Sequence, residues 1–113
     1  MRIAAALLVF AATSFAQPNE SMKVMGSIGC LVQEESQWYL TNATEPVLAT
    51  EVDQDLDPTA KGDLRFHLIG TLEEFSAPKH LKHKVRVKGL IIEAEPEPNF
   101  NITSLKHVAP CCP

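Results

Sequence analysis

The alternation of polar and apolar residues is clearest in residues 81–93. Basic and apolar side chains alternate there in the order Lys84, Val85, Arg86, Val87 and Lys88. A period of two is typical of a β-strand with one face in water and one face in the core. Gly89 and the apolar residues 90–92 that follow it predict that the strand bends and then buries both of its faces.

The same alternation predicts four further strands, at residues 23–33, 38–42, 64–69 and 100–108. In the first strand, Cys30 shares the more apolar face with Ile28 and Val32, so we expect Cys30 to point toward the core. In the third strand, Phe66 and Leu68 should point inward. Residues 42–63 are polar and acidic, which predicts a long loop with a short extended piece at residues 47–52.

A short helix is predicted between the third and fourth strands. Thr71 and Glu74 have the spacing of a capping box, and Pro78 ends any helix at the residue before it. Leu72 and Phe75 would be the inward residues of this helix. Three strands, a short helix and two strands are the element order of a five-stranded OB-like β-barrel, in which the helix closes one end. We therefore predict an all-β fold of this type, with a small open sandwich as the alternative.

The N-terminal residues are organised like a secretory signal peptide. A basic start and an apolar run precede Ser14 and Ala16, which are small residues at the positions that a signal peptidase reads. The run is too short to span a bilayer, which needs about 20 apolar residues. We expect a signal peptide at residues 1–16, a disordered leader at 17–22, and one barrel domain with a cysteine-containing C-terminal tail at 23–113. The location would be secreted or periplasmic, without a membrane span.

Composition narrows the function. The chain has 113 residues, with 10 Lys and Arg against 14 Asp and Glu, and a formal net charge of −4. An acidic chain argues against a nucleic-acid binder. No serine lies in the glycine pattern of a nucleophile elbow, and no motif indicates a cofactor. We therefore expect a protein that is not an enzyme and that uses no cofactor.

Three cysteines are present: Cys30, Cys111 and Cys112. In an oxidising compartment, we expect Cys30 to form a disulfide with one of the adjacent pair, which leaves one thiol over. A bond between Cys111 and Cys112, or pairing between two molecules, is the alternative. The chain has no Cys-x-x-Cys spacing, so these cysteines do not predict a metal site.

The strongest candidate for ligand recognition is a set of basic residues, Lys82, Lys84, Arg86 and Lys88. Three of them would line the exposed face of one strand, and OB barrels often bind ligands on such a face. An anionic polysaccharide, a lipid headgroup or an envelope protein would fit this charge. The alternative is that these residues pair with the acidic loops of the same chain.

His80 and His83 are three residues apart, which is a spacing that can bind zinc or copper on a regular helix. Pro78 disfavours a regular helix there, neighbouring lysines repel a cation, and the sequence specifies no third ligand. We therefore expect exposed histidines and no metal site. Weak transition-metal binding in the periplasm is the alternative function.

Three blocks, at residues 29–31, 38–44 and 80–89, together resemble segments of small exported bacterial proteins. Those proteins have an OB-like domain and no established function. The resemblance covers most of the chain that follows the signal peptide. It implies a periplasmic or secreted location and a disulfide between the first strand and the C-terminus, and it transfers no catalytic residue. Lys82 stands at a position where the resemblance leads us to expect glycine.

Overall fold

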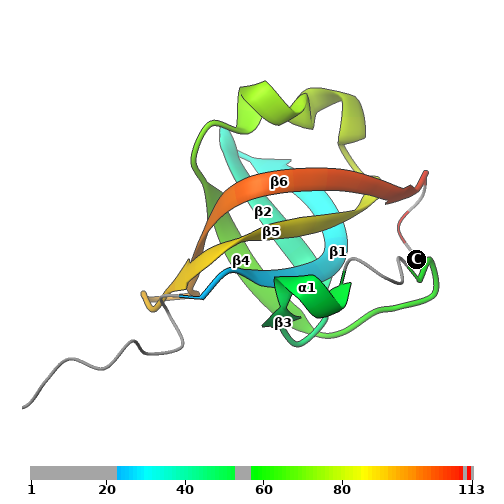
Figure 1. Cartoon of the computed structure of the whole chain (residues 1–113). Helices are drawn as coiled ribbons and strands as arrows, with labels where there is room; N and C mark the ends of the chain where they lie inside the picture. Colours follow the sequence, from blue (N-terminus) through cyan, green and yellow to red (C-terminus); the bar gives the residue numbers. More distant parts are fainter. Residues whose placement is uncertain (1–22, 53–56, 111, 113) are drawn as a thin grey trace, which may run out of the picture.

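The computed structural model describes residues 23–52, 57–110 and 112, and Figure 1 shows their arrangement. The predicted signal peptide at residues 1–16 and the leader at 17–22 lie outside the described residues. Cys111 lies outside them as well.

Six strands form in the described part of the chain, and five of them match the predicted ones to within a few residues. The strands are β1 (Met25–Glu34), β2 (Gln37–Ala43), β3 (Val47–Leu48), β4 (Leu64–Ile69), β5 (Lys84–Ile92) and β6 (Asn99–Ala109). The short β3 agrees with the predicted extended piece at residues 47–52, but the rest of that piece forms the single helical turn α1 (Ala49–Val52) instead. Two 3₁₀ turns, η2 (Leu72–Phe75) and η3 (Ala77–His80), lie between β4 and β5.

The strands close into a barrel. Around the barrel the order is β1, β2, β4, β6, β5 and again β1, while β3 pairs with β1 as an additional short strand. The pair β4–β6 is parallel and the other pairs are antiparallel. This is a five-stranded OB-like barrel, so the predicted fold class is confirmed.

Strand β1 closes the barrel because it pairs with β5 along its first half and with β2 along its second half. Cys30 belongs to both pairings, opposite Thr41 of β2 and Lys84 of β5. A side chain at Gly29 would place its Cβ atom 2.8 Å from the Leu40 side chain and from the Thr41 carbonyl oxygen. Only glycine therefore lets these strands approach so closely.

The barrel is filled by apolar side chains from every long strand. Its buried core consists of Leu31, Leu40, Ala43, Phe66, Leu68, Leu72, Ala77, Val85, Val87, Phe100 and Ile102. Phe66 and Leu68 point inward as predicted, and the Phe66 ring packs edge-on against Phe100 at 5.2 Å between ring centroids. The inward positions of Val85 and Val87 confirm the predicted core face of β5.

Cys30 is buried, with 7% exposure, but it does not belong to the central core cluster inside the barrel, toward which the sequence predicts it to point. Leu31 is the core residue, and Ser27 and Gly29 share its face of β1. Ser27 is buried because its hydroxyl donates a hydrogen bond of 2.8 Å to the Thr44 carbonyl. The inner face of β1 is the less apolar one because tight closure requires small residues there. Cys30 lies on the outer side, where it bonds to Cys112.

The predicted helix is replaced by η2 and η3, which lie across one end of the barrel (Figure 1). The capping box does not form, because the Thr71 hydroxyl donates to the Glu74 carboxylate at 3.1 Å instead of capping a backbone N–H. The segment before Pro78 is too short for a stable α-helix, and a 3₁₀ turn satisfies its backbone in fewer residues. Leu72 and Phe75 still face the core as predicted.

The end of β5 also differs from its prediction. The pairing with β6 shifts register between Lys88 and Gly89, which agrees with the predicted bend. Ile92, however, is 45% exposed, so the strand does not bury both faces. The reason is that β1 pairs with β5 only as far as Gly89, and residues beyond it have β6 as their partner on one side.

The disulfide joins Cys30 to Cys112 across 82 residues, with a Cα–Cα distance of 5.6 Å. A bond that closes so long a loop contributes up to about 4 kcal/mol in the chain-entropy model. We expect Cys112→Ser to lower the free energy of unfolding by as much as this, measured by urea denaturation. Cys111→Ser is the matched control and should leave the value unchanged. An equal loss in both variants would contradict the pairing.

Candidate functional site

The basic face of β5 is largely covered. Lys84 is 2% exposed and Arg86 is 3% exposed, so the prediction that these two side chains meet water is wrong. Both residues do lie on the outer face, because Val85 and Val87 fill the barrel between them. For Lys84 the burial comes from the loop at Pro58 and Ala60, which lies over the barrel wall and which the period of two along β5 does not reveal.

Lys84 holds the long loop that follows α1. Its ammonium group donates hydrogen bonds of 2.7 Å to the Pro58 carbonyl and 2.5 Å to the Ala60 carbonyl. A buried ammonium group is stable only where such partners replace water. Lys84 is therefore buried against backbone carbonyls of the loop, and its ammonium group donates to these carbonyls rather than to carboxylates of the acidic loops.

Lys82 and Lys88 are the more accessible members of the predicted ligand-binding set. Lys82 is exposed and Lys88 is half-buried. Lys82 has a φ of 64°, in the left-handed region that favours glycine. Lys82 lies outside β5, and Lys84 and Arg86 are buried. The four predicted residues therefore do not form one exposed strand face, and Lys82 and Lys88 are the two that solvent reaches. Their role in binding remains a prediction.

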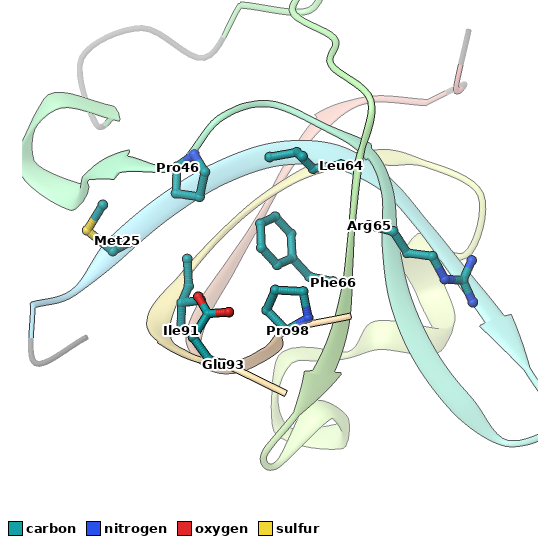
Figure 2. Close-up of a pocket in the computed structure, with 8 residues that line it drawn as sticks. All are labelled: Met25, Pro46, Leu64, Arg65, Phe66, Ile91, Glu93 and Pro98. Carbon is teal, nitrogen blue, oxygen red and sulfur yellow. The ribbon is translucent and has the colours of Figure 1, made fainter. Parts of the chain in front are cut away.

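The end of the barrel away from η2 and η3 contains a cavity of about 380 Å³ (Figure 2). Most of its lining is apolar and comes from strand ends and the segments beside them: Met25, Pro46, Leu64, Phe66, Ile91 and Pro98. Phe66 is 3% exposed and belongs to the core, so the cavity reaches down to the barrel interior. A volume above about 300 Å³ lies in the range of small-molecule sites, and barrel mouths are frequent positions for them.

Exposed apolar side chains lie beside this cavity. Val24 precedes Met25 and is 44% exposed, and Val47 and Leu48 of β3 are each 39% exposed. Leu48 is paired directly with Met25, which lines the cavity. Ile92 is also exposed, at 45%, but it follows the lining residue Ile91 in the strand, points to the other side of β5 and lies outside this group. Single exposed apolar residues are ordinary, but a group beside an apolar cavity indicates a binding surface.

Arg65 lines the cavity only with the aliphatic part of its side chain. Figure 2 shows its guanidinium group pointing away from the apolar residues. The group contacts the Glu34 carboxylate at 2.9 Å and the Glu97 carboxylate at 3.3 Å, and it lies 4.1 Å from the centre of the Tyr39 ring. The hydrogen bond with Glu34 and the two negative charges raise the pKa of Arg65. This cation therefore stabilises the barrel rim and is already paired.

Three histidine rings meet at the opposite end of the barrel. His80 ends η3, His83 precedes β5, and His107 lies in β6 opposite Val85. The ring centroids are 5.8 Å apart for His80–His83, 5.6 Å for His80–His107 and 5.2 Å for His83–His107. Burial, followed by the neighbouring His107, His83 and Lys79, lowers the pKa of His80. The folded environment therefore disfavours the charged imidazolium form of His80.

The fourth histidine, His67, is held in a different environment. One ring nitrogen is 3.1 Å from the Asn99 side-chain oxygen, and the other is 2.8 Å from the Gln37 side-chain oxygen. The ring also lies 5.1 Å from the Tyr39 ring. Both ring nitrogens are therefore engaged in hydrogen bonds that join β2, β4 and β6.

Sequence reasoning missed the cavity and the third histidine. The cavity residues come from segments that are far apart in the chain, between Met25 and Pro98, and only barrel closure brings them together. His107 is more than twenty residues from His83, and the pairing of β5 with β6 places it beside that residue. The sequence did contain one indication. His107 is two residues from Leu105, so both side chains point to the same, core-facing side of β6.

Comparison of the chain with protein-family models, with curated proteins and with solved structures gives no match. Within the described ranges, no helix has the length and apolarity needed to cross a membrane.

The role of Lys84 can be tested by removing its charge while keeping its stem. Lys84→Met should release the Pro58 and Ala60 carbonyls and lower the free energy of unfolding by about 1.5–3 kcal/mol, the range for hydrogen bonds to a charged group. Amide hydrogen exchange of Ala60, whose N–H donates to the Asp57 carbonyl, should become faster. Lys106→Met is the matched control, because Lys106 is an exposed lysine of the neighbouring strand β6. Equal stability of both variants would show that Lys84 does not hold the loop.

Proposed function

We propose that this chain is an exported, non-catalytic binding module that takes the apolar part of a small molecule into the open end of its barrel. The observation that carries this proposal is the cavity lined by Met25, Leu64, Phe66 and Ile91, with exposed apolar side chains beside it. Apolar cavities with few polar groups bind ligands mainly by removing apolar surface from water.

Export is supported by two independent features. The N-terminal sequence has the order of a signal peptide, with a basic start, an apolar run and small residues at the cleavage positions. The Cys30–Cys112 disulfide supports an oxidising compartment, because cytosolic thiols are kept reduced. Both features agree with the resemblance to small exported bacterial proteins and favour a periplasmic or secreted location.

A binding role is favoured over catalysis by the chemistry of the cavity. Among the described residues that line it, the charged side chains are Arg65 and Glu93. Arg65 is paired with Glu34 and Glu97, which leaves Glu93 as the one carboxylate of the lining. Acid–base catalysis generally needs a second positioned group, whereas ligand binding needs only complementary shape and apolar surface.

The cavity can be tested with adjacent isoleucines that differ in orientation. Ile91 lines it, whereas Ile92 does not and is exposed. Anilinonaphthalene sulfonate, a fluorescent apolar probe, should bind the unmodified protein. Ile91→Gln should weaken this binding by roughly tenfold or more, since an unpaired amide in an apolar site costs about 1–3 kcal/mol.

Ile92→Gln is the matched control and should change the affinity little. The near-ultraviolet circular dichroism of both variants must match that of the unmodified protein, so that loss of folding is distinguished from loss of binding. Equal affinity of the Ile91 and Ile92 variants for the probe would overturn the proposed site.

An anionic envelope ligand is the second candidate, and the exposure of Lys82 favours it. If Lys82 and Lys88 bind such a ligand, their joint replacement by Glu should abolish retention on dextran sulfate at low salt. The control is the joint replacement of Lys79 and Lys106, which are also exposed, by Glu. Equal losses in both double variants would show that net charge alone explains retention.

A further inference from the structure

The cluster of His80, His83 and His107 lies at the end of the barrel opposite to the proposed ligand cavity. Its backbone is fixed by the closure of the barrel. The N–H of His83 donates to the His80 carbonyl at 2.8 Å, and the N–H of Leu31 in β1 donates to the His83 carbonyl at 3.1 Å. His107 is fixed by its ladder position opposite Val85. Three imidazoles are thus presented by a rigid framework.

The spacing of the rings is that of three imidazoles around one ion. A Zn–N bond is about 2.0–2.1 Å, and a ring nitrogen lies roughly 1 Å from its ring centroid, so tetrahedral coordination places ring centroids about 5 Å apart. The observed separations are 5.2, 5.6 and 5.8 Å. The backbone therefore holds the three rings close to the separation that a shared ion requires.

Two nitrogens of the cluster lack a hydrogen-bond partner. The Nδ1 atoms of His80 and His83 are buried, and neither makes a hydrogen bond. Buried polar atoms are nearly always satisfied, and an exception calls for a physical reason such as an ion or a water.

We propose that His80, His83 and His107 form a binding site for a divalent transition-metal ion of the class that prefers imidazole, with Cu²⁺ bound more tightly than Zn²⁺. Imidazole nitrogen suits both ions, and affinity at nitrogen sites rises from zinc to copper. This site is independent of the barrel cavity. It also extends the two-histidine alternative of the sequence by supplying a third ligand.

Binding requires the rings to turn. As the side chains stand, the described residues contain no group of three or more His, Cys, Asp or Glu that could hold an ion. The torsion that turns an imidazole about its Cβ–Cγ bond is broad and roughly two-fold, so reorientation costs little when the backbone stays in place. The exposure of His107 leaves its ring room to move.

The charges around the cluster limit its affinity. Three exposed lysines each directly precede a histidine of the cluster: Lys79, Lys82 and Lys106. Like charges near the site weaken cation binding, although water and salt screen exposed groups. The predicted affinity is therefore tighter than millimolar but weaker than that of a closed structural zinc site.

Isothermal titration calorimetry with Cu²⁺ and with Zn²⁺ tests the proposal. The protein carries Cys111→Ser, so that the cysteine left over from the disulfide cannot bind the metal. We expect one ion per chain, and a higher melting temperature with Cu²⁺ than without it. His107→Gln should weaken the affinity for both ions at least tenfold. It should leave the melting temperature of the metal-free protein within a few degrees of the parent, because this ring is exposed.

His67→Gln is the matched control, because it removes the one histidine outside the cluster and should leave both affinities unchanged. His83→Gln serves as a second variant should His107→Gln fail to fold. Affinity no tighter than millimolar in the parent would overturn the proposal. So would equal affinities of the parent and the folded cluster variant, or a loss in His67→Gln as large as the loss in His107→Gln.

Discussion

Closure of the barrel at Cys30 is the constraint on which the rest of the structure depends. At this residue β1 passes from pairing with β5 to pairing with β2, and the strand must coil tightly to reach both. Gly29 removes the side chain that would block the approach of β2. The disulfide to Cys112 then ties the C-terminal end of the chain to the same point. The register set there also fixes Lys84, which pairs with Cys30 and holds the Pro58 and Ala60 carbonyls.

Two basic side chains of this protein, those of Lys84 and Arg65, are engaged in contacts within the fold. A lysine on the outer face of a barrel strand is ordinarily available to a ligand. Here the ammonium group of Lys84 is buried under a loop of the same chain, so its hydrogen bonds contribute to the fold. Arg65 is engaged similarly between Glu34 and Glu97. A count of basic residues along a strand therefore overstates the charge available for recognition.

The two ends of the barrel differ in chemistry because they are closed differently. At one end, η2 and η3 lie across the strands and bring His80 to the rings of His83 and His107. At the other end, β5 extends past its pairing with β1, and no comparable segment among the described residues fills the opening beside Ile91. An apolar cavity and a nitrogen-rich cluster thus occupy opposite ends of one small domain.

The sequence by itself determined the strands, their order and the OB-like class, because alternation with a period of two depends only on which face of each strand meets the core. It also predicted that Cys30 bonds to the C-terminal pair, but it left a Cys111–Cys112 bond and pairing between two molecules open and did not choose between Cys111 and Cys112. Only the tertiary structure decided that Cys30 faces outward, that Lys84 is buried and that His107 joins two distant histidines. These outcomes depend on what covers each face and on which strands become neighbours. Local periodicity carries no information about contacts between segments that are far apart in the chain.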